Sequence, residues 1–130
     1  MRPFLSLILL IGIIFLSSCE ELLEVTDISD QELNLLAPSD SVVVTQNEVR
    51  FSWNEVFEAN SYHVQVAQPN FENAVQVVID TLVVVDSTYL GSSFVKPLSD
   101  SSYEWRVKAM NSDFETEYKT HAFWVESTKN

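Results

Sequence analysis

Three segments of the chain alternate apolar and polar residues one by one, which is the pattern of a β-strand with one buried face. Residues 49–53, 62–66 and 103–109 follow this pattern. Successive side chains of a strand point to opposite faces of its sheet, so each segment offers one apolar face to a core. We therefore predict half-buried strands at these three places.

Two further segments complete the set of predicted strands. Residues 120–125 form a final strand, and residues 74–85 form a β-branched run that Asp80-Thr81 interrupts. We expect this run to be two strand segments or one long bent strand. Three prolines fall between the runs, where a missing backbone N–H does no harm: Pro38, Pro69 and Pro97. No long segment has helical periodicity, so about seven short strands predict an all-β, antiparallel β-sandwich.

The most apolar part of the chain lies at its N-terminus. After Arg2, residues 4–15 form a nearly continuous apolar run. As a helix this run would extend roughly 18 Å at about 1.5 Å per residue, which is short of a hydrocarbon core of about 30 Å. The length favours the apolar core of a signal peptide over a membrane-spanning helix.

The sequence Leu16-Ser17-Ser18-Cys19 follows that run and resembles the lipobox of bacterial lipoproteins. The resemblance implies that residues 1–18 are a signal peptide and that Cys19 becomes an acylated N-terminus. Several acyl chains make anchoring durable, whereas a single chain gives only marginal binding. The alternative is an ordinary secretory signal beside a chance cysteine. We favour the lipoprotein because Cys19 is the only cysteine in the chain.

The acidic pair Glu20-Glu21 follows Cys19 directly. It resembles the export signal of surface lipoproteins in the Bacteroidetes group, which implies display on the cell surface at the bacterial outer membrane. A periplasm-facing anchor is the alternative, since tethers are often acidic. Residues 19–33 contain no Gly or Pro and many acids. We expect a lipidated N-terminus and tether there, a domain at residues 34–127 and a tail at residues 128–130.

Charge and cysteine content exclude several kinds of partner and site. The chain of 130 residues has 7 Lys and Arg against 19 Asp and Glu, a net charge of -12. Such a chain repels phosphate backbones, so we expect no nucleic-acid partner. A single cysteine cannot form an intramolecular disulfide, and only His63 and His121 could join it at a zinc ion. We expect neither a metal nor a cofactor.

Residues 35–126 resemble a fibronectin type III domain of the kind common in bacterial surface proteins. The resemblance rests on four groups of residues that occur in the family's order: Phe51-Ser52-Trp53; Ala59 with Tyr62-x-Val64-x-Val66; Leu98 with Tyr103-x-Trp105-Arg106-Val107-x-Ala109-x-Asn111; and Phe123-x-Val125. The resemblance implies an immunoglobulin-like sandwich. The usual glycine is replaced near Phe114, and no Arg-Gly-Asp motif is present, so integrin-type binding is not implied.

This layout implies a particular core. Trp53 and Trp105 come from opposite sheets and fill the centre between them, and Tyr62 joins the core. Tyr103 lies at a corner between two strands, with its hydroxyl bonded to the backbone near Leu98, as in the tyrosine corner of such sandwiches.

No group of residues in the sequence forms a catalytic constellation. His63 alternates outward on its strand, and His121 lies near the start of the last strand. Neither lies in a nucleophile motif, and the one glycine after Cys19, Gly91, is too few for a phosphate-binding loop. We expect a protein that is not an enzyme, with both histidines at the surface or at an edge.

Two features are candidates for a binding surface. Loops 54–60 and 111–118 should meet at one end of the sandwich, the usual recognition end, and carry Phe57, Phe114 and Tyr118 among acidic residues. These aromatics form a binding surface if they are exposed. The alternative, which we favour, is that Phe57 and Phe114 fold back onto the end of the core.

The second feature is Trp124, which points outward if Phe123 and Val125 point inward. We expect it to lie beside Arg106 in a cation–π stack worth about 0.5–1 kcal/mol. An exposed tryptophan that holds a sugar is the alternative.

A short motif occurs three times and resembles the O-glycosylation acceptor of exported Bacteroidetes proteins. Its three copies are Asp40-Ser41-Val42, Asp80-Thr81-Leu82 and Asp86-Ser87-Thr88.

Two functions stay open. The first is a lipid-anchored binding or scaffolding module that presents its sandwich to a protein partner. The second is a glycan-binding accessory lipoprotein of an outer-membrane polysaccharide-uptake system. Exposed aromatics clustered on one face favour the glycan, whereas an unpaired edge strand around residues 75–79 favours the protein partner. An enzyme needs a deep pocket, which so small a sandwich rarely has.

Overall fold

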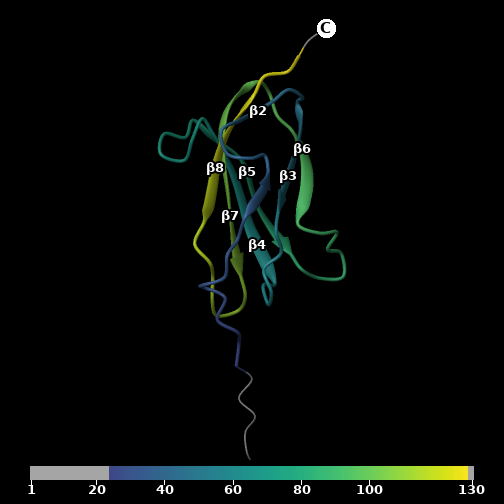
Figure 1. Ribbon diagram of the computed structural model, residues 1–130, viewed down its shortest axis with the longest axis vertical. Coiled ribbons are helices and arrows are strands. Elements are labelled where there is room, and N and C mark those ends of the chain that lie inside the picture. The colour runs from purple at the N-terminus through teal and green to yellow at the C-terminus, as the bar shows by residue number, and fades with distance from the viewer. Residues whose placement is uncertain (1–23, 129–130) are drawn as a thin grey trace, which may run out of the picture.

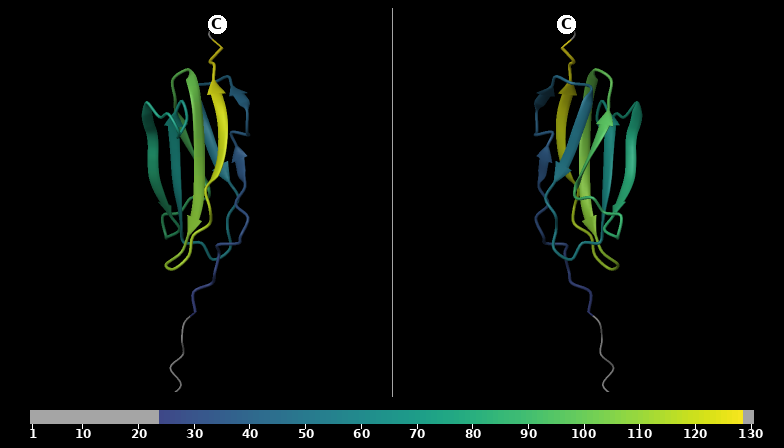
Figure 2. Two further views of the ribbon diagram at one scale, coloured as in Figure 1. Left: turned by 90° about the vertical axis from the view of Figure 1, so that its left-hand side faces the viewer. Right: turned by 90° about the vertical axis from the view of Figure 1, so that its right-hand side faces the viewer.

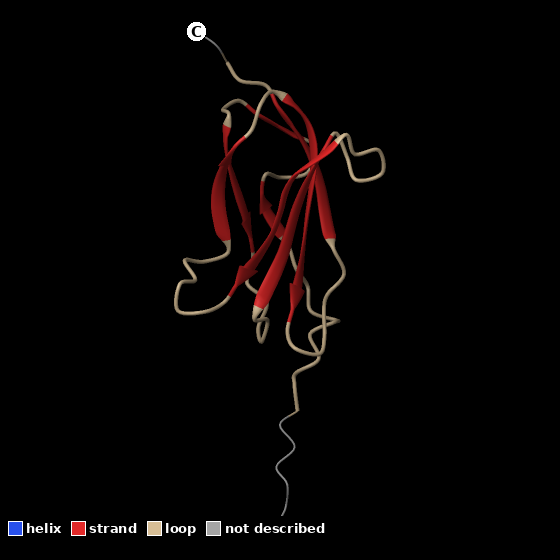
Figure 3. Ribbon diagram, turned by 180° about the vertical axis from the view of Figure 1, so that it is seen from behind, coloured by secondary structure: helices blue, strands red, loops and turns tan. Residues whose placement is uncertain are grey.

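The computed structural model describes residues 24–128, and within them the chain forms strands and loops but no helix (Figures 1 and 3). The eight strands are β1 (Leu35–Ala37), β2 (Val42–Val44), β3 (Glu48–Trp53), β4 (Ser61–Gln68), β5 (Gln76–Val84), β6 (Ser93–Pro97), β7 (Ser101–Met110) and β8 (Lys119–Val125). The predicted signal peptide and Cys19 lie outside the described residues. Nothing within residues 24–128 forms a helix that is long and apolar enough to cross a membrane.

The strands form two sheets that pack face to face. One sheet has the order β1-β3-β6 and the other has the order β2-β8-β7-β4-β5, so that β5 and β8 lie on opposite sides of β7 (Figure 2). Neighbouring strands are antiparallel except for β2 and β8, which run parallel with Val42 opposite Phe123. This is the strand order of a fibronectin type III domain, in which A-B-E faces A′-G-F-C-C′. The predicted immunoglobulin-like sandwich is confirmed.

The structure has eight strands, where the sequence predicts about seven, because the N-terminal strand divides between the two sheets. Its first part, β1, pairs with β3, and its second part, β2, pairs with β8. Two hydrogen bonds to Ala122 fix this crossing from one sheet to the other. The N–H of Ser41 donates to the carbonyl oxygen of Ala122, and the N–H of Ala122 donates to the carboxylate of Asp40. Ser41 has a positive φ of 62°, which turns the chain there.

Large aromatic side chains fill the space between the sheets. Trp53 on β3 and Trp105 on β7 belong to opposite sheets and are both buried, as predicted. Phe51 packs edge to face against Trp105, with ring centroids 5.1 Å apart. Tyr62 is also buried, and its hydroxyl accepts a hydrogen bond from the N–H of Val56.

The predicted tyrosine corner is also present. The hydroxyl of Tyr103 donates to the carbonyl oxygen of Ser99 over 2.6 Å. Ser99 directly follows Leu98, near which we expected the bond. Tyr103 is itself buried and stacks on Phe123, so one residue ties the turn before β7 to the core.

The boundary expected between tether and domain lies too late in the chain. Ile28 and Leu33, within the predicted tether at residues 19–33, are 0% and 4% exposed and belong to the core. The carbonyl oxygen of Thr26 accepts a hydrogen bond from the side chain of Asn111. The packed domain therefore starts near Thr26, because burial of two apolar side chains holds this acidic segment against the sandwich.

Candidate functional site

The structure separates the residues that the sequence suggested as a binding surface. Tyr118 and Arg106 lie together on the outer face of the five-stranded sheet. Phe57 lies at the end of the sandwich and is 77% exposed, so it does not fold back as we expected. Phe114 does pack against the core. Trp124 lies elsewhere, next to β2.

Arg106 is held between two aromatic side chains on this outer face. Its Cζ atom lies 4.0 Å from the ring centroid of Phe71 and 4.3 Å from that of Tyr118. Its Nε donates to the side-chain oxygen of Gln65 over 2.8 Å. Stacking on aromatic faces and one directed hydrogen bond fix the guanidinium in place.

The predicted stack of Arg106 on Trp124 is wrong. In the pairing of β7 with β8, Arg106 lies opposite Thr120, and Trp124 lies opposite Ser102. Both side chains point outward as expected, but the register places them four residues apart along the sheet. Trp124 is 38% exposed and lies beside Val43 of β2. The alternation pattern gives the face of each residue and not the register between strands.

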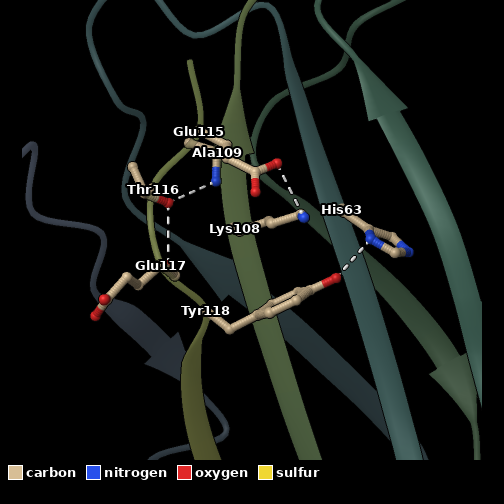
Figure 4. A network of polar contacts seen from close by, with 7 residues as sticks. All are labelled: His63, Lys108, Ala109, Glu115, Thr116, Glu117 and Tyr118. Carbon is tan, nitrogen blue, oxygen red and sulfur yellow. Dashed lines mark hydrogen bonds and ion pairs between the residues drawn. The ribbon is translucent and has the colours of Figure 1, made fainter. Parts of the chain in front are cut away.

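A chain of hydrogen bonds runs across the same face through Tyr118, His63 and Asp80. Figure 4 shows its first link, between Tyr118 and His63. The Nδ1 atom of His63 lies 2.6 Å from the hydroxyl of Tyr118, and its Nε2 atom lies 2.5 Å from Asp80 Oδ1. An ionised carboxylate can only accept, so Nε2 of His63 donates to Asp80, while the Tyr118 hydroxyl is bonded at Nδ1. The hydrogen bond from His63 holds the pKa of Asp80 below its ordinary value, and Gln65 and Arg106 act in the same direction.

The loop before β8 is tied to the sheet by two more groups (Figure 4). The Nζ atom of Lys108 lies 4.9 Å from the ring centroid of Tyr118 and 3.1 Å from a carboxylate oxygen of Glu115. The hydroxyl of Thr116 is buried and accepts a hydrogen bond from the N–H of Ala109. These contacts make the outer face a structural lock between β4, β5, β7 and the loop before β8, and they leave the side chain of Asp80 58% exposed.

A groove of about 830 Å³ adjoins this lock, between the N-terminal segment and the loop before β8. Its charged lining is mainly acidic and consists of Asp30, Glu32, Glu115, Glu117, Lys108 and Lys119. Within residues 24–128, no three His, Cys, Asp or Glu side chains are grouped so that they could hold a metal ion.

The strand β5 forms one free edge of the five-stranded sheet. It has nine residues, no proline and one charged residue, Asp80. Several of its apolar side chains are exposed, with Val77 at 49%, Leu82 at 54% and Val84 at 45%. Long, apolar edge strands are uncommon on monomeric proteins because their unpaired backbone groups bind other strands. Of the predicted run at residues 74–85, Gln76–Val84 forms one long strand, and this strand is the unpaired edge considered from the sequence.

A second groove, of about 610 Å³, runs along this edge between β5 and β6. It exists because these two edge strands belong to different sheets and do not pair with each other. Val78, Ile79 and Val83 line it from β5, together with the polar Asp80 and Thr81. Phe94 and Lys96 line it from β6, and residues 88–91 line it from the loop between the two strands. The groove thus places apolar side chains directly beside the unpaired backbone of β5.

The three motifs that resemble glycosylation acceptors have their hydroxyl-bearing residues at exposed positions: Ser41, Thr81 and Ser87. Each aspartate of these motifs accepts a structural hydrogen bond, from Ala122, His63 and Thr88 respectively. These hydrogen bonds give each aspartate a structural role in the fold that does not depend on glycosylation.

The sequence pattern indicates Arg106 and Tyr118 as site residues but not their partners Phe71, Asp80 and Lys108. Part of the signal was present, because Lys108 occupies an outward position on the same predicted strand as Arg106. Phe71 lies in a loop, where no periodicity reports the direction of a side chain. Only the folded chain brings it onto the sheet.

Comparisons with known proteins support the fold alone. No protein-family model and no curated protein sequence matches this chain. An engineered protein of known crystal structure is similar with a TM-score of 0.52 and 18% identity, over 72% of this chain and 20% of that one. The extracellular region of rat CD45, domains d3-d4, is similar with a TM-score of 0.45 and 14% identity, over 83% and 75% of the two chains. This chain spans about a fifth of the length of the engineered protein, and at 18% identity the likeness shows a shared fold alone.

Proposed function

We propose that this chain is a lipid-anchored binding module without catalytic activity. In this proposal residues 1–18 direct export, Cys19 carries the acyl chains, and the sandwich is displayed on the surface of the outer membrane. There it binds a protein partner along the free edge of β5. The observation that carries the proposal is that edge: nine residues without proline, with exposed apolar side chains and an apolar groove beside them.

The position of the N-terminal segment favours a partner on the side of the sandwich. Residues 20–25 are the only ones between Cys19 and Thr26, which is bonded to the loop before β8. Six extended residues span about 20 Å. Loops 54–60 and 111–118 lie at the end where the N-terminal segment enters, and the C-terminus lies at the opposite end (Figure 1). A lipid at Cys19 would therefore hold these loops toward the membrane and leave β5 open.

Glycan binding is the second candidate, and one observation favours it. Phe71 and Tyr118 are two aromatic residues on one face, as a sugar platform requires. However, Arg106 stacks on both rings, and both residues are only partly exposed. We therefore rank the glycan below the protein partner.

The anchor is tested by expressing the full chain in a bacterial host and measuring the mass of the mature N-terminus. The proposal expects cleavage before Cys19, acylation of that residue, and recovery with outer membranes. Protease added to intact cells should remove the sandwich. A Cys19→Ser variant that stays in the membrane fraction with an unchanged mass would contradict the anchor.

The binding edge is tested by site-specific photo-crosslinking in native envelopes. A photoreactive amino acid replaces Leu82 on β5 in one variant and Val43 on β2 in the matched control. These positions are similarly exposed, at 54% and 47%, and lie on the two opposite edge strands of the five-stranded sheet. We expect one defined protein adduct from position 82 and none from position 43. Adducts from both positions, or from neither, would contradict binding at β5.

A further inference from the structure

The backbone of β5 presents hydrogen-bonding groups to the free edge at three alternate residues. The N–H of Val85 donates to the carbonyl oxygen of Asn60, so Val85 faces β4. Backbone groups of successive residues in an antiparallel strand point to opposite sides. Asp80, Leu82 and Val84 therefore direct their N–H and C=O groups away from β4, where no other described strand pairs with them.

The three other edge strands of this sandwich are less suited to strand addition. The edge strand β6 has five residues and carries Lys96 and Pro97. The edge strands β1 and β2 have three residues each. Short edges, lysine and proline are the features that natural sheets use to discourage pairing. Strand β5 has nine residues and contains neither lysine nor proline. It has one irregularity, a bulge near Val78, which is another feature that discourages pairing.

The two sides of β5 determine which side chains an added strand would need. Asp80 and Leu82 lie opposite Gln65 and His63 and belong to the outer face. Val83 belongs to the other side and lines the groove beside β6. Side chains of an added strand alternate in the same way, so every second one enters the apolar groove and the others lie beside Asp80.

Charge distinguishes between the possible occupants. Asp80 is the only charged residue of β5 and its side chain is 58% exposed. The whole chain carries a net charge of -12. Two copies of it repel each other, and an antiparallel pair centred on β5 brings the two Asp80 carboxylates together. A basic strand is attracted both by the domain and by Asp80 itself.

We infer that β5 binds one extended segment of a basic partner protein, whose alternate apolar side chains fill the groove between β5 and β6. A lysine or arginine of the segment pairs with Asp80 on the outer face. This inference rests on the proposed function and adds the chemistry of the partner. The segment of the partner adds a sixth strand to the five-stranded sheet of this domain.

A probe peptide tests this chemistry directly. The probe is a capped, fluorescent nonapeptide in which valine alternates with lysine, and the control probe has glutamate in place of lysine. The protein is the mature chain from Cys19 in detergent micelles, and binding is measured by fluorescence anisotropy. We expect the lysine probe to bind at least about tenfold more tightly than the glutamate probe. Equal affinities would overturn the basic character of the partner.

Substitutions in β5 separate strand addition from general attraction to an acidic surface. Leu82→Pro removes an N–H that faces the edge and leaves the bonds to β4 intact, whereas the matched Leu82→Ala keeps that N–H. We expect the proline variant to bind the lysine probe about tenfold more weakly than the alanine variant, the scale of one or two lost hydrogen bonds. Equal binding by the two variants would overturn strand addition.

A second measurement does not depend on a folded proline variant. Amide hydrogen exchange at Asp80, Leu82 and Val84 is followed by NMR in the unsubstituted protein. The lysine probe should slow exchange at these three amides, and unchanged exchange would overturn the inference. Asp80→Lys should shift the preference between the probes toward glutamate by about twofold to fivefold.

The outcomes also separate this inference from the proposed function. A protein adduct at position 82 together with no binding of the lysine probe would overturn the partner chemistry and support the binding edge. Absence of both would overturn both. An adduct at position 82 with twice the mass of the chain would identify a second copy and overturn the basic partner.

Discussion

The indole nitrogen of Trp105 lies 3.1 Å from the carbonyl oxygen of Pro38, to which it donates a hydrogen bond. The other large core side chain, Trp53, has an equally buried indole nitrogen for which the described residues provide no acceptor. A buried donor without a partner costs about 1–3 kcal/mol, whereas a paired one contributes about 0.5–1.5 kcal/mol. Two residues that look alike in the sequence therefore differ in their contribution to stability.

Replacement of each tryptophan by phenylalanine should reveal this difference. Both changes remove similar volume, but Trp105→Phe also removes a hydrogen bond, and Trp53→Phe removes an unpaired donor. We expect Trp105→Phe to lower the free energy of unfolding by about 1 kcal/mol more than Trp53→Phe does, as measured by urea denaturation. The alanine variants at both positions should each cost about 3–5 kcal/mol, because both side chains fill the centre of the core. Equal costs for the two phenylalanine variants would contradict the assignment of the hydrogen bond.

Much of this core could be predicted from the sequence because its signal is local. Strict alternation on β3, β4 and β7 identifies Trp53, Tyr62 and Trp105 as inward residues, and a strand needs only its own sequence to show this. Ile28 and Leu33 gave no such signal. They lie in an acidic segment without a regular period, and their burial depends on a surface that the rest of the fold creates.

The burial of Ile28 has a measurable consequence. Ile28→Ala should lower the free energy of unfolding by about 2–5 kcal/mol, because a fully buried side chain is truncated. The matched control is Glu24→Ala, four residues earlier and exposed, which should change stability by less than about 0.5 kcal/mol. If both variants unfold at the same urea concentration as the original protein, the segment is a tether after all.

The contact between Arg106 and Tyr118 can be tested by a double-mutant cycle. We expect Arg106→Gln and Tyr118→Leu to be coupled by about 0.5–1 kcal/mol, since the guanidinium lies 4.3 Å from the Tyr118 ring centroid. A control cycle of Arg106→Gln with Trp124→Leu should give a coupling near zero. Coupling to Trp124 instead of Tyr118 would restore the stack expected from the sequence. Urea denaturation of the original protein, the three single variants and the two double variants provides all the values.

At the candidate site, the direction of side chains could be predicted from the sequence, but their contacts could not. Arg106 and His63 were correctly placed on an outward face, because direction follows from alternation within one strand. Their partners depend on register and on loops: Phe71 approaches from the β4–β5 loop, and Tyr118 comes from the residue before β8. Neither register nor loop path is encoded in a period of two residues, so the contacts themselves needed the structure.

Tyr89 should give the protein a stability that is lost at alkaline pH. Burial, together with its hydrogen bond to the carboxylate of Glu55, raises the pKa of Tyr89 from 10.0 to about 12. Because the folded state favours the neutral phenol, this contribution is fully present below pH 10 and is lost as the pH rises toward 12. Glu55→Gln removes the negative acceptor and should bring the pKa of Tyr89 down toward its ordinary value. The titration is followed by tyrosinate absorbance, with Tyr89→Phe subtracted to isolate this residue from the three other tyrosines. An unchanged midpoint in Glu55→Gln would show that burial alone causes the shift.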